Sequence, residues 1–194
     1  TSEAWTWERM ALTRARVLHA TDVFRARLEP LITALLRQPR DQASVLSDVA
    51  TMRARVAAEF PGTGVWSLKY VRGGLVDLEF IAQTLQLTTC AVVPSVLGRP
   101  TAAVFEELGA QGQLDPEAAR ELAETTRLYQ DVEGLFRLCL EGAPTDDTIP
   151  AGLARALVRV ANMPDIGMLK AELSARQRMV MAHFDAIVGA APGA

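Results

Sequence analysis

The chain has 194 residues, of which 49% are hydrophobic and 22% are charged, and its formal net charge is −3. This composition fits a folded chain with one hydrophobic core and excludes a disordered or collagen-like polymer. Because the charge balance is weakly acidic, the surface is a poor match to the phosphate backbone of DNA or RNA, and we expect no nucleic-acid partner.

Helix-forming residues dominate the chain, and only 6% of its residues are aromatic. Apolar side chains recur at helical spacing in most segments, and no stretch alternates for long with the period of a strand. We therefore predict an all-α bundle of about seven to eight helices, with residues 1–194 forming a single domain. In chain order, the predicted helices span residues 3–19, 22–38, 45–60, 75–87, 101–110, 115–142, 150–162 and 165 to near the C-terminus.

Prolines and glycines mark several of the predicted helix ends. Pro61 and Gly62 end the third helix, and Asp115 followed by Pro116 is typical of a helix start. Pro30 lies inside the second helix, where it removes one backbone donor and crowds the preceding turn, so we expect a kink or a restart there. The apolar stripe of the third helix consists of Val45, Val49, Met52, Val56 and Phe60.

The residues that most often bind zinc are few and isolated. Cys90 and Cys139 have no CxxC spacing, and His19 and His183 stand alone, so we expect no metal site and no catalytic residue in this chain. The cysteines fit a reducing compartment. No secretory leader opens the chain and no apolar run approaches the roughly 18 to 20 residues of a membrane span, so we expect a cytoplasmic protein without a membrane partner.

The segment from Trp66 to Leu87 departs from the amphipathic pattern. Its apolar residues cover most of a helix circumference, which predicts that this helix lies at the centre of the bundle. Glu79, Gln83 and Gln86 follow the spacing i, i+4 and i+7 and form one polar stripe. If these side chains are buried, each of them requires a hydrogen-bond partner.

Two glycines, Gly73 and Gly74, precede this helix and allow a sharp turn or a close approach of another group. With Lys69 and Arg72 just upstream, the N–H groups at the helix start would form a pocket that favours an anion. This chemistry makes the segment a candidate binding site.

Asp77 and Glu79 provide the competing explanation, because carboxylates in the first turns of a helix satisfy its dipole and can pair with Lys69 or Arg72. On this basis a structural role in ion pairing and capping is slightly favoured over a ligand site. The two carboxylates lie about 200° apart around a helix, so they cannot converge on one metal ion while the backbone stays helical.

Residues 69–83 resemble the K-x-x-x-GG-[IL]-x-D-[IL]-EF-x-x-Q signature in the helical domain of glutamine synthetase adenylyltransferases. Residues 4–16 are similar to the W-E-x-x-AL-x-x-AR segment of that family, and residues 52–55 are similar to its MR-x-[KR] segment. The three matches follow the family's order across the first half of the chain. Val76-Asp77 is similar to the C-terminal, adenylylating half of these enzymes. Val71 departs from the family, because relatives often have a small residue at that position.

The resemblance implies that the chain is a fragment of a larger enzyme. In that family a nucleotidyltransferase domain with Asp-x-Asp ligands for two magnesium ions precedes the helical domain. The complete enzyme would transfer adenylyl groups from ATP to a tyrosine of glutamine synthetase, and remove them by phosphorolysis, in nitrogen regulation. ATP and Mg²⁺ would bind the absent catalytic domain, and the fragment would be inactive. The implied partners are that domain, glutamine synthetase and the PII signalling protein.

The resemblance also selects candidate site residues. We expect the signature to form either a face that meets the missing domain, close to its nucleotide phosphates, or a buried salt-bridge hub, and we expect Arg9 and Arg16 to lie near the same seam. The candidates are Lys69, Arg72, Gly73, Gly74, Asp77, Glu79, Gln83, Arg9 and Arg16.

Three alternatives stay open at this point. A related uridylyltransferase would share a looser Lys-Gly-Gly-Asp version of the domain. A stand-alone all-α regulator that responds to a ligand and binds DNA would require a basic helix-turn-helix, and residues 1–60 show no convincing pair of such helices. A metal-dependent enzyme built on Asp77 and Glu79 would require their carboxyl groups to converge.

Overall fold

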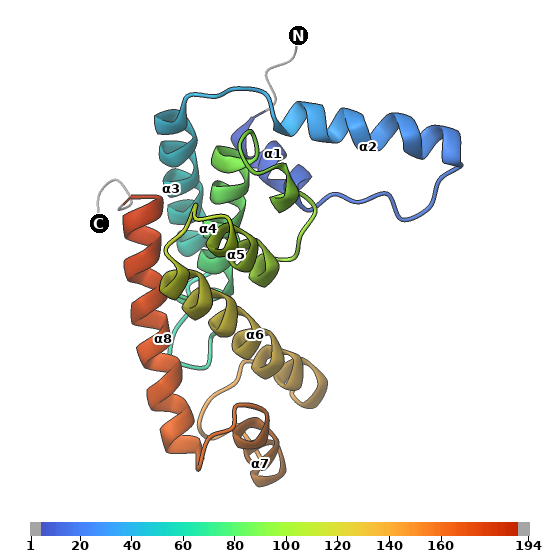
Figure 1. Ribbon diagram of the computed structural model, residues 1–194. Coiled ribbons are helices and arrows are strands. Elements are labelled where there is room, and N and C mark those ends of the chain that lie inside the picture. Colours follow the sequence, from blue (N-terminus) through green and yellow to red (C-terminus); the bar gives the residue numbers. More distant parts are fainter. Residues whose placement is uncertain (1–4, 190–194) are drawn as a thin grey trace.

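The computed structural model describes residues 5–189, which form eight α-helices and one short 3₁₀ helix and contain no strand (Figure 1). The predicted all-α bundle is therefore confirmed. The elements are α1 Thr6–Thr13, α2 Asp22–Leu36, α3 Gln42–Glu59, α4 Leu75–Thr89, η1 Pro94–Val96, α5 Thr101–Ala110, α6 Pro116–Cys139, α7 Ala151–Val160 and α8 Ile166–Ile187.

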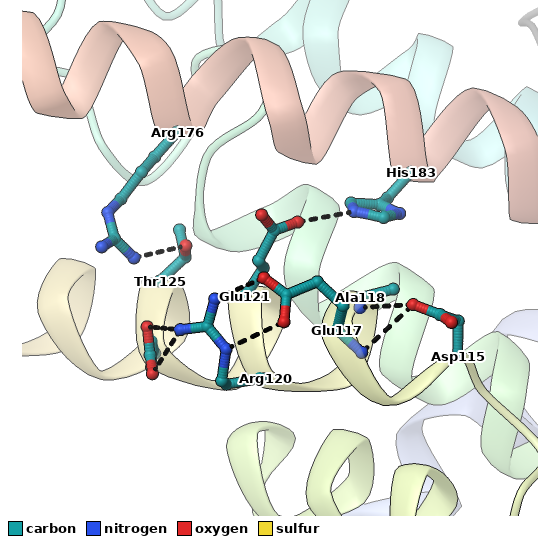
Figure 2. Close-up of polar contacts among 9 residues, drawn as sticks. Asp115, Glu117, Ala118, Arg120, Glu121, Thr125, Arg176 and His183 are labelled. Atoms are coloured by element: carbon teal, nitrogen blue, oxygen red, sulfur yellow. Dashed lines mark hydrogen bonds and ion pairs between the residues drawn. The ribbon is translucent and has the colours of Figure 1, made fainter.

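Side-chain caps fix several helix starts. The Asp115 carboxylate accepts hydrogen bonds from the N–H groups of Glu117 and Ala118, at 3.1 and 3.0 Å, as Figure 2 shows. Asp165 accepts one from the Met168 N–H at the start of α8, at 2.8 Å. Each cap satisfies an amide that the helix itself leaves without a partner, which is why these acidic residues mark helix ends in the sequence.

The prediction for the end of the first helix is wrong, and the restart that was one of the two outcomes expected at Pro30 does not occur. The first helix ends at Thr13 and not at residue 19, because the Thr13 hydroxyl donates to the Met10 carbonyl at 2.7 Å and the chain then continues as a loop. Residues 3 and 4 of that prediction lie outside the described residues. The second helix does not restart, since α2 runs through Pro30; Pro30 and Ala26 are both exposed, so water can reach the carbonyl that lost its donor.

Helix α4 is the centre of the bundle, as predicted. It packs against α1, α3, α5, α6 and α8, and two thirds of its length is buried. The buried side chains are Val76, Asp77, Leu78, Ile81, Ala82, Gln83, Thr84, Leu85, Gln86 and Leu87. The stripe of polar residues on α4 is therefore largely enclosed, and Gln86 Nε2 finds its partner in the Val96 carbonyl of η1 at 2.7 Å.

Polar contacts join α6 to α8 beside this core (Figure 2). Arg176 of α8 donates to the Thr125 hydroxyl at 2.9 Å, and His183 Nε2 lies 3.5 Å from a Glu121 oxygen. Arg120 binds carboxylates one turn before and after it on the exposed face of α6. The contacts of Arg176 and His183 therefore join α8 to α6, whereas those of Arg120 stay within α6. A search of the described residues for a helix with the length and hydropathy of a membrane span finds none.

The two cysteines differ in accessibility. Cys90 is buried, its thiol donates to the Leu36 carbonyl at 3.3 Å, and burial raises the pKa of this thiol, whereas Cys139 is exposed. Since the thiolate is the reactive form, we predict that a disulfide reagent such as DTNB modifies one thiol per native chain and two after denaturation. A Cys139→Ser variant should lose the fast phase. Two fast native thiols would contradict the packing described here.

Candidate functional site

The loop before α4 folds back over the start of that helix. The N–H of Leu75 donates to the Leu68 carbonyl at 2.7 Å, and the N–H of Val76 donates to the Lys69 carbonyl at 3.1 Å. The first amides of α4 are therefore occupied by the chain's own carbonyls. An anion at this end of the helix would have to bind to side chains such as Lys69 and Arg72 and not to these amides.

The two glycines fit positions that a side chain would block. Gly73 has a φ of +78°, and a Cβ atom there would lie 1.9 Å from the Gln177 carbonyl oxygen of α8. A Cβ atom on Gly74 would lie 2.3 Å from the Leu68 carbonyl oxygen. The close approach that the glycines permit is thus an approach of the protein's own backbone, which brings α8 against the start of α4.

Asp77 lies at the centre of a buried ionic cluster, which we call the Asp77 hub: Asp77, Arg53, Arg72 and the Gly73 amide. The Asp77 side chain is fully buried and forms an ion pair with the buried Arg53 guanidinium of α3. The Gly73 N–H donates to the second carboxylate oxygen. Arg53 also donates to the Tyr70 carbonyl at 3.0 Å, so the hub ties α3, the loop and α4 together.

Arg72 extends the hub to the surface. Its Nη1 lies 3.3 Å from an Asp77 oxygen, and its Nη2 lies 3.2 Å from an Asp185 oxygen of α8. The guanidinium also stacks 4.8 Å from the centre of the Phe184 ring. Arg72 therefore links the start of α4 to the end of α8 while about a third of its side chain stays exposed.

The structure does not bring all the candidate residues into this hub. Lys69 is exposed, with Nζ 4.8 Å from the centre of the Tyr70 ring. Glu79 points to α1 and pairs with Arg14 at 3.1 Å. Gln83 is buried further along α4, and Arg16 is exposed in the loop after α1.

Arg9 lines a cleft of about 580 Å³ between α1 and α3, with Arg40 and Arg55 among the other lining residues. Arg9 Nη1 donates to the Leu35 carbonyl at 3.4 Å. The Nε atoms of Arg9 and Arg40 are buried without a hydrogen-bond partner in the described part of the chain. Both atoms are therefore buried donors that the described residues leave unsatisfied.

Arg53 is the functional-site residue that sequence reasoning missed as a site candidate. Val45, Val49 and Arg53 follow one another at intervals of four, and all three are buried. The predicted stripe passed through Met52 and Phe60 instead, and Phe60 is 43% exposed. A charge in register with two buried valines was the available signal, because buried arginines are rarely unpaired.

The described residues offer no arrangement for metal catalysis. They contain no group of three or more His, Cys, Asp or Glu side chains that could hold a metal ion. Asp77 and Glu79 contact different partners, Arg53 and Arg14, and so do not form a common ligand set. The magnesium ions implied by the resemblance therefore do not fit the residues of this region.

Comparison with known families agrees with this all-helical architecture. Residues 51–188 match the model of the family described as GlnD PII-uridylyltransferase, and the chain belongs to that family. The match begins within α3 and includes the loop, α4 and every later helix.

Individual relatives identify the kind of enzyme that contains such a region. The chain is 42% identical over 187 residues to the bifunctional glutamine synthetase adenylyltransferase/adenylyl-removing enzyme of Rhodopseudomonas palustris strain BisB5, and 43% identical to that of strain HaA2. The enzyme of the same name from Mesorhizobium japonicum is 40% identical over 189 residues. These matches cover 96–97% of the chain and 19% of each relative. The resemblance inferred from the three motifs is confirmed.

The contact between Gly73 and α8 can be tested with a matched pair of variants. We predict that Gly73→Ala destabilises the fold by about 2–5 kcal/mol, from a positive φ and a steric clash with the Gln177 carbonyl. Gly64 has a similar φ of +79° but nothing within 4 Å of the added Cβ, so Gly64→Ala should cost about 1–2 kcal/mol. Urea unfolding measures both, and equal losses would contradict the clash.

The Asp77 hub predicts a non-additive mutational cycle. Arg53→Met leaves a buried carboxylate without its main cation, and we expect a loss of about 3–5 kcal/mol. Asp77→Leu should cost a similar amount, whereas Arg53→Met/Asp77→Leu should cost clearly less than the sum, because the double variant leaves no buried unpaired charge. Urea unfolding gives the cycle, with Arg120→Met on exposed α6 as a control of little effect. Additive losses would refute the coupling.

Proposed function

We propose that this chain is a helical accessory domain of a glutamine synthetase adenylyltransferase, within a longer polypeptide that adenylylates a tyrosine of glutamine synthetase and removes the adenylyl group by phosphorolysis. The observation that carries the proposal is the extent of the match. Enzymes named for this activity align with 96% of the chain at 42–43% identity, yet the chain spans only about a fifth of their length.

The nucleotidyl transfer itself belongs, in this proposal, to another part of the polypeptide. The support is chemical: the described residues hold no set of carboxylates or imidazoles that could bind magnesium, and the best buried carboxylate, Asp77, is already paired with two arginines. ATP and Mg²⁺ are thus assigned to the catalytic domain, and the isolated chain is inactive. In this proposal the helical domain contributes a rigid surface on which the catalytic domain docks.

Two positively charged regions are the proposed contacts with the catalytic domain. Lys69 and Arg72 form one, because the Asp77 hub holds the loop rigid while both cations stay accessible. Arg9 and Arg40 form the other, since both line the cleft between α1 and α3, where their guanidinium groups can pair with a carboxylate supplied from outside the chain. Arg72 can pair with Asp77 and still bind the catalytic domain, because its guanidinium group has five N–H donors.

The second candidate is the uridylyltransferase alternative, in which the same kind of helical domain serves a PII-modifying enzyme. The description of the matched family favours it. The 42–43% identity to enzymes named as adenylyltransferases favours the first candidate instead. A DNA-binding regulator has no such support. PII is retained as a regulatory partner only as a proposal.

Labelling experiments separate these candidates. The complete protein, incubated with glutamine synthetase, Mg²⁺ and ATP labelled at the α-phosphate, should label glutamine synthetase, and with PII and labelled UTP it should label nothing. The isolated chain should label neither protein. Labelling of PII would move the domain to the second candidate, and turnover by the isolated chain would refute the assignment of the chemistry to another domain.

Charge reversal provides the test of the proposed contact. Lys69→Glu in the complete protein should lower the adenylylation rate several-fold, while Arg159→Glu, an exposed reversal on α7, should not. Lys69 contributes little to the core, so the melting temperature should stay unchanged. Unchanged kinetics for Lys69→Glu would leave the loop with a bracing role only.

A further inference from the structure

Helix α2 carries an apolar stripe that the rest of the chain covers only at one end. Phe24, Leu28, Leu31 and Leu35 follow one another at intervals of four, three and four, which places them on one face. At the C-terminal end, Leu35 is half-buried and Leu36, on the adjacent face, is buried. Toward the N-terminal end Leu28 is half-buried, whereas Phe24 and Leu31 are 57% and 63% exposed.

The exposure is a consequence of where α2 lies. Figure 1 shows that α2 extends away from the bundle, with its C-terminal end near α1 and α3 and its N-terminal end at the far tip. Leu36 is the single buried residue among its fifteen. Val23 on the helix and Leu18 in the loop before it add further exposed apolar surface. A helix of this length is marginal in water on its own and is normally stabilised by packing of its apolar face.

The boundary of the family match points in the same direction. It starts at residue 51, so α1, α2 and the first half of α3 lie outside the shared helical domain. The alignments with the adenylyltransferases cover 96% of the chain, which leaves too few residues unaligned to exclude α2. Thus α2 is shared with the long enzymes but is not a part of the domain that the family model describes.

We propose that the Phe24–Leu31 face of α2 docks onto an adjoining domain of the same long polypeptide. This inference rests on the proposed function, since it takes the chain to be part of a larger protein. Four fifths of each relative lies outside the aligned region, which provides ample polypeptide to cover the face. The contact is apolar, and Phe24 supplies an aromatic group of the kind enriched at interfaces.

A second copy of the chain is the competing occupant, and hydrogen exchange distinguishes the two. In the complete protein the amides of α2 should exchange at least tenfold more slowly than in the isolated chain, while those of α6 should be alike in both. Equal exchange of α2 in both would overturn the proposal. The proposal would also be overturned if protection of α2 in the isolated chain increased with protein concentration and light scattering gave the mass of a dimer. That result would assign the face to a second copy of the chain.

Substitutions on the face give an independent readout. Phe24→Asp and Leu31→Glu should not alter the melting of the isolated chain, because both side chains are mostly exposed there and Asp suits the first turn of a helix. In the complete protein the double variant should be cleaved by trypsin after Arg27 at least tenfold faster than the unsubstituted protein. Val92→Asp, at a site 72% exposed in the turn after α4, is the matched control and should leave the cleavage rate unchanged.

The outcomes separate this inference from the function on which it rests. If the complete protein adenylylates glutamine synthetase but the α2 substitutions leave cleavage at Arg27 unchanged, the docking surface is refuted and the function stands. If no adenylylation occurs but α2 is protected and the substitutions expose it, the docking surface stands and the enzyme assignment fails.

Discussion

The fold depends on enclosing one carboxylate. Asp77 is fully buried, and a buried charge is tolerated only when it is paired and hydrogen-bonded. Its partners come from two segments: α3 supplies Arg53, and the loop supplies Arg72 and the Gly73 amide. The fold therefore has to bring α3, the loop and α4 together. The glycines follow from the same requirement, because a side chain at position 73 would push α8 away from the loop. The motif at residues 69–83 therefore contains residues that join the loop rigidly to α3, α4 and α8.

This junction gives the proposed accessory role a physical basis. The Asp77 hub fixes the loop from three sides, yet Lys69 and part of Arg72 stay accessible on its outer surface. A rigid loop loses little conformational freedom when it binds, so a neighbouring domain would meet a surface that is already ordered. The elements α1 and α2 lie outside the region that the family model matches, and the proposed docking face of α2 is therefore separate from this loop.

The sequence predicted the all-α class, the central position of α4 and the limits of α5, because apolar periodicity and proline or aspartate caps are local signals. It did not predict the partner of Asp77, since Arg53 is 24 residues away and only the packing of α3 brings it close. The early end of α1 was missed because a single hydroxyl, that of Thr13, competes with the helix. The sequence also left two interpretations of Gly73 open, because the group that approaches it, the Gln177 carbonyl, lies 104 residues further along the chain.

The ion pair between Arg72 and Asp185 has a practical consequence for the design of shorter versions of this chain. The loop before α4 contacts α8 at Gln177 and Asp185. A shorter chain that lacks part of α8 would therefore expose Asp77 to water. A shortened version of the chain should therefore keep the whole of α8, and should not be cut in the irregular segment between α6 and α7.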